Sequence, residues 1–243
     1  MRRFFAPSEN FNEQNITLNV EETRHLRDVL RLRTGENVQI FDGAGREFLC
    51  AIKKIEKKET ILKIIEETAP PAPESSLDLT LAVALLKGEK FDLVVQKAVE
   101  LGVTKLVPLN TKRADAKSVG SEKKLARWRK IIIDASKQTG RAKLMQIETP
   151  IDFAQFTNSA LKNFNEANLL LFAERNGGSF SDVKINEKIV AVVGSEGGWD
   201  DTEIDLARHQ NFQIITLKGR ILRAETAAIS VATILQHRFG DIH

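Results

Sequence analysis

The sequence predicts an α/β protein in which a small β-rich barrel precedes a larger domain built on a mainly parallel sheet. Residues 1–72 contain several short runs with the alternation and β-branched content of strands. The segment 68–76 follows, and Pro70, Pro71 and Pro73 make it stiff and extended, as in a linker. Beyond it, apolar runs alternate with helical patterns, which is typical of a parallel sheet. We therefore expect one domain at residues 1–72 and a second at 73–243.

The composition excludes several classes of protein. The chain has 243 residues, 42% hydrophobic and 28% charged, as in ordinary folded domains. It has neither an apolar run of membrane length nor a signal-peptide pattern, so we expect no membrane partner. The single cysteine, Cys50, excludes an internal disulfide and fits a reducing, cytoplasmic location. The four histidines are scattered, so no metal-ligand spacing exists and we expect no metal.

The first domain is predicted to consist of four strands and one helix. Short strands interrupted by a single helix suggest a small barrel. The helix is expected at 21–30, with Leu26, Val29 and Leu30 on its apolar face. Arg24, Arg27 and Arg31 are spaced i, i+3 and i+7, so they share another face. The strands are expected at 16–20, 38–41, 48–55 and 60–65, with a hairpin-type turn at 42–45.

The second domain is predicted to alternate strands with helices. The strand at 189–193 is a continuous apolar run, which indicates burial on both faces of a sheet. The other strands are expected at 79–86, 105–108, 144–147, 169–173 and 212–217. Helices are expected at 90–101, 122–139, 153–163, 203–209 and 225–238.

Positive charge is concentrated in two segments. Residues 112–143 contain eleven basic and three acidic residues, a local charge of +8, and four arginines with one acid occupy residues 24–33. Clustered cations of this kind are typical of a surface that binds a polyanion such as RNA. A solvated helix face is the alternative interpretation.

Two consecutive strands end in glycine loops. Gly194–Gly198 follows the strand at 189–193, and Lys218-Gly219-Arg220 follows the strand at 212–217. Ligands of open α/β sheets bind beyond the carboxyl ends of the strands, and glycine lets the backbone approach them closely. We therefore expect one pocket between the loops, with a third loop, 174–178, near it. The alternative is that each loop is an ordinary tight turn.

The motifs in this pocket restrict its chemistry. The chain has no phosphate-binding P-loop, no G-x-G-x-x-G turn and no G-x-S-x-G elbow. The expected pocket is glycine-rich and apolar, with Glu196, Arg223 and Glu225 as its charged residues. Such a site suits a flat, moderately polar ligand. Transfer of a group from an adenosyl cofactor fits, because that reaction needs alignment more than acid–base machinery.

The same motifs resemble those of a known family. GSEGGW at 194–199 and LKGRILRAETA at 217–227 are similar to the paired cofactor motifs of the 16S rRNA uridine N3-methyltransferases, which are knotted enzymes of the SPOUT superfamily. MRRFF at the start, then HLRDVLRLRTGE and FDGAG, resemble the amino-terminal PUA-like barrel of that family. LLKGEKFDLVVQKAVELGV at 85–103 resembles the first half of its catalytic domain. The family usually has proline where this chain has Ser195.

The resemblance implies a fold, a cofactor and an assembly. The second domain is expected to form a trefoil knot in which residues 219–227 pass through an earlier loop, a rare topology. S-adenosyl-L-methionine is expected to bind in the knot, and two chains are expected to form a homodimer through it. The implied cofactor-binding residues are Phe172, Gly194, Glu196, Gly198, Leu217, Gly219, Leu222, Arg223, Thr226 and Ala227.

The implied reaction is methylation of N3 of a uridine in the decoding region of 16S rRNA, within the 30S subunit. The base must leave its stack for N3 to be reached. Arg223 is expected to stabilise negative charge on the uracil oxygens, or to anchor the cofactor carboxylate. Glu225 is expected to accept the N3 proton, or to occupy the favourable first turn of the last helix. The residues expected to bind RNA phosphates are Arg2, Arg3, Arg24, Arg27, Arg31 and Arg141.

Two other functions fit the pattern less well. One is ribose 2′-O-methylation by a related knotted enzyme, but ILRAETA favours the base methylase. The other is a non-catalytic RNA-binding assembly factor that retains the knot. Cofactor binding and the identity of the modified nucleoside distinguish these alternatives.

Overall fold

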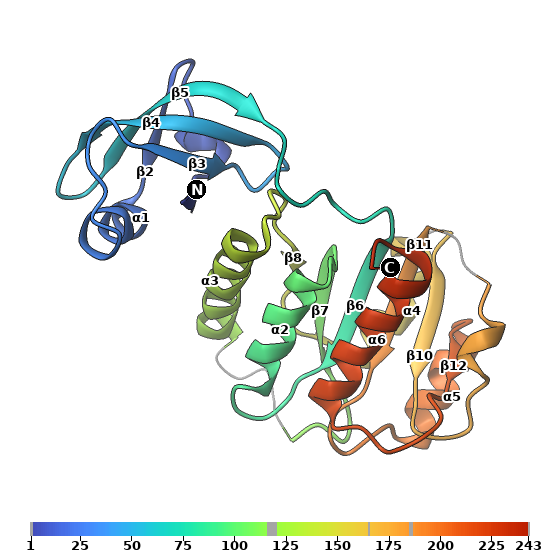
Figure 1. Cartoon of the computed structure of the whole chain (residues 1–243). Helices are drawn as coiled ribbons and strands as arrows, with labels where there is room; N and C mark the ends of the chain where they lie inside the picture. The colour runs from blue at the N-terminus through green and yellow to red at the C-terminus, as the bar shows by residue number, and fades with distance from the viewer. Residues whose placement is uncertain (1, 116–120, 165, 185–186, 243) are drawn as a thin grey trace. The chain divides into compact units, whose positions relative to one another are not determined.

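The structure is a computed structural model that describes residues 2–115, 121–164, 166–184 and 187–242 (Figure 1). The chain forms two compact units. Unit 1 comprises Met1–Glu74 together with Ile133–Leu144. Unit 2 comprises Ser75–Ile132 together with Met145–His243. Unit 1 therefore includes a segment from the middle of the chain, beyond the range expected from the linker.

Unit 1 is built on a five-stranded sheet in the order β1-β3-β4-β5-β2. Its neighbouring strands are antiparallel except for the parallel pair β1 and β3. The strands are β1 (Arg3–Phe5), β2 (Asn15–Leu18), β3 (Asn37–Phe41), β4 (Glu47–Ile55) and β5 (Thr60–Thr68). The four predicted strands are confirmed. The three residues of β1 are too few to show an alternating pattern, so the sequence did not predict that strand.

The core of unit 1 lies between this sheet and its helical segment. Phe4, Val38 and Leu62 are fully buried there, because alternate residues of each strand point to the same face. Cys50 is fully buried as well. Burial raises the pKa of its thiol to about 12, so Cys50 acts as a small hydrophobic side chain.

The predicted helix at 21–30 differs from expectation. Helix α1 (Val20–Arg24), capped by the Asn19 side chain, continues as the π-helical segment η2 (His25–Val29). The wider turn changes the angular spacing of the side chains, and Arg31, with φ of 54°, lies beyond the helix end. The prediction that Arg24, Arg27 and Arg31 share one helical face is therefore wrong. Val29 is 66% exposed, so its predicted place on the apolar face is wrong too.

Unit 2 contains a parallel sheet in the order β12-β10-β11-β6-β7-β8, with β9 paired to β7. Each pair of neighbouring strands is parallel, which confirms the mainly parallel sheet. The strands are β6 (Asp78–Ala84), β7 (Lys105–Asn110), β8 (Gln146–Ile147), β9 (Ile151–Asp152), β10 (Asn168–Phe172), β11 (Lys188–Val193) and β12 (Gln213–Ile215). Because β12 ends at Ile215, the residues from 216 to 223 form a loop.

Helices cover both faces of this sheet. Helices α2 (Lys90–Glu100) and α6 (Ala224–Phe239) lie side by side, and α6 packs on β6 and β11 (Figure 1). Helices α4 (Phe153–Asn163) and α5 (Asp201–His209) pack on each other and on the other face. Helix α3 (Ser121–Thr139) begins in unit 2 and ends in unit 1. No helix in the described segments is long and apolar enough to cross a membrane.

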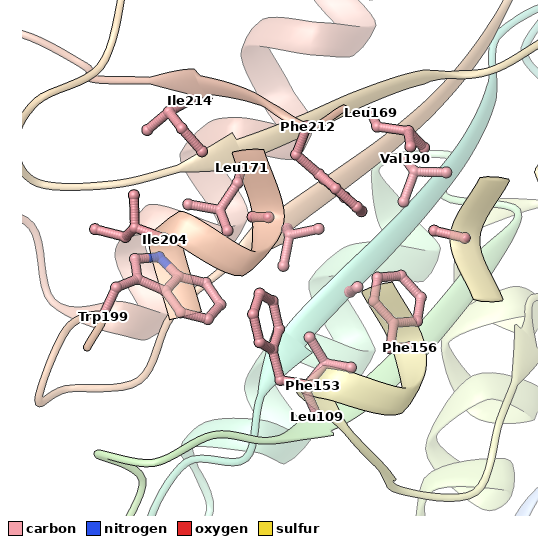
Figure 2. Packing of buried hydrophobic residues seen from close by; sticks show 14 of the residues in the cluster. Leu109, Phe153, Phe156, Leu169, Leu171, Val190, Trp199, Ile204, Phe212 and Ile214 are labelled. Atoms are coloured by element: carbon pink, nitrogen blue, oxygen red, sulfur yellow. The ribbon is translucent and has the colours of Figure 1, made fainter. Parts of the chain in front are cut away.

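Aromatic side chains fill the space between the sheet and helices α4 and α5 (Figure 2). The rings of Phe153 and Trp199 have centroids 4.9 Å apart, and Phe156 packs near Phe212. Trp199 is 1% exposed, so its indole ring packs in the core and is not available to stack on a base. This packing fixes the loop between β11 and α5, to which Trp199 belongs.

Candidate functional site

A pocket of about 800 Å³ lies where strands β10, β11 and β12 end. Its walls are the loops that follow these three strands and the first turns of α6, with Lys90 of α2 at one side. This is the sheet edge at which parallel α/β folds bind their ligands. The volume is within the range of small-molecule pockets.

The pocket brings together most of the residues expected at a cofactor site. Those that line it are Phe172, Gly194, Glu196, Gly198, Leu217, Gly219, Leu222, Arg223 and Ala227. Thr226, also expected there, is exposed and is not part of the lining. Glu225 is not part of the lining either, because at the second position of α6 it points toward Lys90.

Glycines give the loop after β11 its shape. A Cβ on Gly197 would lie 2.7 Å from the Arg113 carbonyl oxygen, so only glycine fits against that backbone. Gly198 has φ of 67°, which side chains disfavour, and its N–H donates to the Ser195 carbonyl over 3.0 Å. Ser195 is buried, and its Oγ has no hydrogen-bond partner in the described structure. The loop is therefore a tight turn that leaves main-chain groups facing the pocket.

The buried Trp199 side chain joins the two loops that line the pocket after β10 and β11. Its indole Nε1–H donates to the Phe172 carbonyl at 2.9 Å, which connects the ends of β10 and β11. A Cβ on Gly194 would lie 3.0 Å from two atoms of the same ring, so a larger residue at position 194 would crowd the indole. The two loops are therefore held at a fixed separation by one buried side chain.

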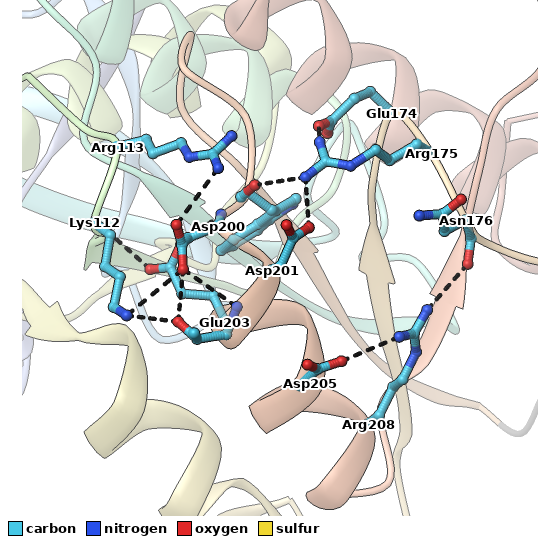
Figure 3. Close-up of polar contacts among 12 residues, drawn as sticks. Lys112, Arg113, Glu174, Arg175, Asn176, Asp200, Asp201, Glu203, Asp205 and Arg208 are labelled. Atoms are coloured by element: carbon cyan, nitrogen blue, oxygen red, sulfur yellow. Dashed lines mark hydrogen bonds and ion pairs between the residues drawn. The ribbon is translucent and has the colours of Figure 1, made fainter.

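A polar network braces the outer side of these loops (Figure 3). Asp200 caps α5 and forms a capping box with Glu203. Glu203 also accepts a hydrogen bond of 2.9 Å from the Lys112 main-chain N–H, which attaches the loop after β7. Arg175, from the loop after β10, donates to Asp201 over 2.8 Å. Three loops from three strands are thus tied to the start of one helix.

Lys90 is a pocket residue that the sequence motifs did not predict. Its Nζ lies 3.0 Å from Glu196 Oε1 and 3.8 Å from Glu225 Oε2, so one cation holds two carboxylates beside the pocket. Burial alone would raise the pKa of Glu196, but main-chain donors and the Lys90 ammonium lower it overall. Its place in the chain could have indicated this role, because Lys90 comes soon after β6 and so lies at the same edge of the sheet.

Three cations on the loop 216–223 differ from the others at this edge. Lys218, Arg220 and Arg223 line the pocket and, among the described residues, have neither an ion pair nor a side-chain hydrogen bond. Arg223 is exposed and occupies the N-cap position of α6. These side chains are therefore available to anionic groups that enter the pocket.

Two arginines expected at an RNA surface are instead buried in unit 1. Arg3 makes a bidentate pair with Glu47, at 3.0 and 2.8 Å, and donates to the Ser136 carbonyl over 2.7 Å. Arg141 is 5% exposed and pairs with Glu74 over 2.6 Å. Moving either guanidinium to a phosphate would leave a carboxylate unpaired. We therefore propose that Arg3 and Arg141 stabilise unit 1 through these pairs rather than bind RNA.

The other predicted RNA-binding residues are more accessible. Arg2, Arg24 and Arg31 are exposed. Arg27 is partly exposed and pairs with the neighbouring Asp28 over 2.7 and 2.9 Å. These four arginines of unit 1 remain candidates for phosphate contacts.

Several cations of the basic segment 112–143 form ion pairs with acids from other parts of the chain. Arg127 pairs with Asp92, and Lys137 pairs with Glu22, acids that lie far away along the chain. Lys112 and Arg113 face Asp200. Lys117 lies outside the described residues. Within the described ranges, no group of three or more His, Cys, Asp or Glu side chains could hold a metal ion.

Comparison with known proteins identifies the family. The model of an RNA methyltransferase domain matches residues 73–236, and the model of an RNA methyltransferase PUA domain matches residues 18–65. Ribosomal RNA small subunit methyltransferase E of Rickettsia conorii is 36% identical over 213 residues, 85% of this chain and 82% of its own. The chain belongs to the small subunit methyltransferase E family.

Solved structures agree with this membership. Methyltransferase E from Neisseria gonorrhoeae, crystallised with bound S-adenosyl methionine, is 33% identical, superposes with a TM-score of 0.91 and covers 100% of both chains. A Legionella pneumophila protein described as a methyltransferase, also solved with this cofactor, is 33% identical, has a TM-score of 0.90 and covers 98% of both chains. The two units are thus those of a PUA-containing methyltransferase of this family.

Proposed function

We propose that the protein transfers a methyl group from S-adenosyl-L-methionine to N3 of a uridine in the decoding region of 16S rRNA. The observation that carries the proposal is the glycine-lined pocket at the ends of β10, β11 and β12, in a chain of the methyltransferase E family. We further propose that the protein acts in the cytoplasm, on RNA within the 30S subunit.

The pocket residues fit the adenosyl cofactor. Gly197 and Gly198 line the pocket, and glycine lets this loop pack against Arg113 and Glu174, where a Cβ would collide. Phe172, Leu222 and Ala227 supply apolar surface for a flat base, and Arg223 is free to pair with a carboxylate. When bound, the cofactor supplies a methyl group on a sulfonium, which is already a good leaving group. The task of the chain is then to align the acceptor nitrogen.

The acceptor requires a change in protonation. N3 of uracil carries a proton that it must lose before or during attack, and the resulting negative charge spreads onto the flanking carbonyl oxygens. Arg223 lines the pocket without an internal partner, so it can donate to one of these oxygens. Its alternative role is to hold the cofactor carboxylate.

Glu225 has a different role in this proposal from that of a proton acceptor. Its carboxylate points to Lys90 rather than into the pocket, and Lys90 also binds Glu196. We assign Glu225 to positioning Lys90, and its place in the first turn of α6 adds a favourable helix-dipole interaction. Main-chain donors and Lys90 outweigh burial and lower the pKa of Glu196, so we do not assign the N3 proton to that carboxylate.

The assembly expected for the family is part of the same proposal. The chain runs from β12, at one edge of the sheet, to α6, which packs beside β6 and β11 in its middle. This return supports a trefoil knot at residues 219–227, and a homodimer formed through it. Sedimentation of the purified protein tests the dimer, because a monomer at micromolar concentration contradicts it.

Identification of the modified nucleoside tests the proposed function. The protein is incubated with labelled cofactor and, separately, naked 16S RNA, 30S subunits that lack the modification, and tRNA, and the nucleosides are then analysed by mass spectrometry. The proposal predicts 3-methyluridine from the small-subunit RNA. Methyl on a ribose, or on tRNA alone, would contradict it.

Substitution of Arg223 tests whether the pocket carries out the methylation. Arg223→Ala should lower the methylation rate at least about a hundredfold, because it removes a charged donor from the site. Lys188→Ala, which alters an exposed cation at the start of β11, should leave the rate unchanged. A near-normal rate for Arg223→Ala would remove Arg223 from the chemistry.

A further inference from the structure

The loop after β10 contains the one Asn-Gly pair in the sequence, Asn176-Gly177. Asn176 is exposed and has φ of 58°, a left-handed conformation that asparagine tolerates better than most residues. Asparagine before glycine is prone to deamidation, because glycine has no Cβ to keep its main-chain nitrogen away from the asparagine side chain. The side-chain amide of Asn176 is therefore a candidate for chemical modification.

Deamidation at this pair needs only water as a co-reactant. The main-chain nitrogen of Gly177 attacks Cγ of Asn176, and the new C–N bond closes a succinimide ring. The side-chain nitrogen leaves as ammonia, which takes the proton of the Gly177 amide. Water then opens the ring at either carbonyl. Opening at the side-chain carbonyl gives aspartate, and opening at the main-chain carbonyl gives isoaspartate, in which Cβ and Cγ become part of the main chain.

The fold opposes this reaction at the attacking nitrogen. The Gly177 N–H donates to Thr216 Oγ1 over 3.0 Å, which holds its proton and fixes its peptide group. A Cβ on Gly177 would lie 2.6 Å from the Ile215 carbonyl carbon, so this peptide packs closely on the end of β12. The Asn176 carbonyl also accepts a hydrogen bond of 3.2 Å from Arg208 (Figure 3). Attack on Asn176 therefore requires the loop to open.

The same loop connects two walls of the cofactor pocket. The Gly178 N–H donates to the Ile214 carbonyl over 2.9 Å, and the Gly178 carbonyl accepts from the Thr216 N–H over 3.1 Å. Glu174, just before these contacts, and Leu217, just after them, line the pocket. The loops after β10 and β12 are thus held together at this point.

We propose that Asn176 deamidates when this loop opens, that Thr216 slows the reaction, and that the isoaspartate product separates the two pocket loops. Isoaspartate lengthens the main chain and replaces the amide with a carboxylate. The tight packing of Gly177 on Ile215 leaves too little room for the added main-chain atoms. Modification should therefore weaken cofactor binding, a consequence that rests on the proposed function, whereas the modification itself does not.

Timed incubation followed by peptide mapping tests the site. Wild type, Thr216→Val, Thr216→Ser and Asn176→Gly are held at mildly alkaline pH, in native buffer and in concentrated urea. Cleavage by chymotrypsin after Phe172 and Phe180 releases residues 173–180, whose asparagine, aspartate and isoaspartate forms are separated and measured by mass spectrometry. Asn176→Gly is the matched control, because glycine fits φ of 58° and carries no amide.

We expect Thr216→Val to deamidate at least about fivefold faster than wild type in native buffer, because a hydrogen bond that keeps the loop closed is lost. Thr216→Ser keeps the hydroxyl and should match wild type within about twofold. In urea the three chains that retain Asn176 should react at one rate, faster than native wild type.

Cofactor affinity measures the consequence of the modification. The isoaspartate form of wild type, separated by ion exchange, should bind S-adenosyl-L-methionine at least about tenfold more weakly than the unmodified form in calorimetry. Asn176→Gly incubated for the same time should keep its initial affinity, which excludes damage elsewhere in the chain.

Three results would overturn the inference. One is unchanged Asn176 in wild type unfolded in urea, which would show that the pair is not reactive. Another is an equal native rate for wild type and Thr216→Val, which would remove Thr216 from control of the reaction. The third is normal cofactor affinity in the isoaspartate form. If unmodified wild type binds no S-adenosyl-L-methionine, the proposed function fails, and the first two results still decide whether Asn176 is a modification site.

Discussion

At the residue scale, buried arginines illustrate how context decides the role of a charge. Arg3 and Glu47 have side chains that are 8% and 0% exposed, and their two hydrogen bonds form a parallel fork. Arg3 also donates to main-chain carbonyls of α3. A guanidinium with this many internal acceptors stabilises the fold rather than a ligand.

Removal of Arg3 should destabilise unit 1 strongly. Arg3→Met leaves the fully buried Glu47 carboxylate without its partner, so the free energy of unfolding should fall by about 3–5 kcal/mol. Urea denaturation measures this change. The matched control is Arg24→Met, which alters an exposed arginine of the same unit and should cost less than about 0.5 kcal/mol. Equal effects of the two substitutions would show that burial does not determine the role of Arg3.

Ser195 provides a second prediction at this scale. Its buried hydroxyl has no partner, and an unsatisfied buried polar group lowers stability. Ser195→Ala should therefore raise the free energy of unfolding by about 1 kcal/mol, which thermal denaturation can detect as a higher Tm. A lower Tm would mean that the hydroxyl forms a hydrogen bond in solution.

The sequence predicted the pocket residues best where a local motif, such as a glycine loop at the end of a strand, marks their position. The glycines and apolar residues of the pocket loops could be placed, because motifs at strand ends are read locally. Lys90 could not, since its function depends on two acids that are 106 and 135 positions away along the chain. Arg3 and Arg141 were assigned to RNA for the same reason: their acidic partners lie 44 and 67 positions away.

At the element scale, the turn between β3 and β4 is stabilised by one carboxylate. Asp42 accepts hydrogen bonds from the main-chain N–H groups of Ala44 and Arg46, at 2.8 and 3.0 Å, and from the Arg46 side chain. Burial alone would raise the pKa of Asp42, but these donors together hold it below its usual value. A lowered pKa means that folding favours the ionised form.

The stability of this turn should depend on pH in a defined direction. The contribution of ionised Asp42 is complete above its unfolded pKa, and it is lost as the pH falls through the lower folded pKa. The stability advantage of wild type over Asp42→Asn should therefore shrink as the pH falls from about 5 toward 2. Urea unfolding at several pH values measures it. A difference that stays constant over this range would contradict the assignment.

The loop after β11 yields the most direct prediction for an element. Gly197→Ala places a Cβ 2.7 Å from the Arg113 carbonyl oxygen, a backbone atom that cannot move alone. The loop must shift, so affinity for S-adenosyl-L-methionine should fall at least about tenfold in calorimetry. In the control, Gly178→Ala, the nearest atom is 3.9 Å away, so binding should stay unchanged. Normal affinity for Gly197→Ala would separate this loop from the cofactor.

Elements with strong periodicity were predicted well, and those fixed by tertiary contacts were not. Helix α4 has the predicted bounds, and α2 and α3 end or begin within one residue of theirs. The strands β1 and β9 contain three and two residues, too few to form a pattern. The apolar residues of η2 have the spacing of a regular α-helix, so the sequence does not reveal its π-helical turn.

At the scale of the whole molecule, the alternation of strands and helices predicted the parallel sheet, but not its order. β12 pairs with β10, and β11 pairs with β6, so neighbours in the sheet are distant in the sequence. Such pairings depend on long-range packing that no local pattern records. No local pattern predicts that residues 133–144 belong to unit 1 either, because α3 is one continuous helix whose sequence shows no break at residue 133.

The central claim is that the loops after β11 and β12 form one cofactor pocket. A crystal structure of the protein with S-adenosyl-L-methionine tests it most directly. We expect the cofactor to lie between Gly194–Gly198 and Leu217–Arg223, with its methyl group facing Arg223. A cofactor bound elsewhere, or loops that close on their own side chains in a crystal saturated with cofactor, would show that these two loops do not form the cofactor site.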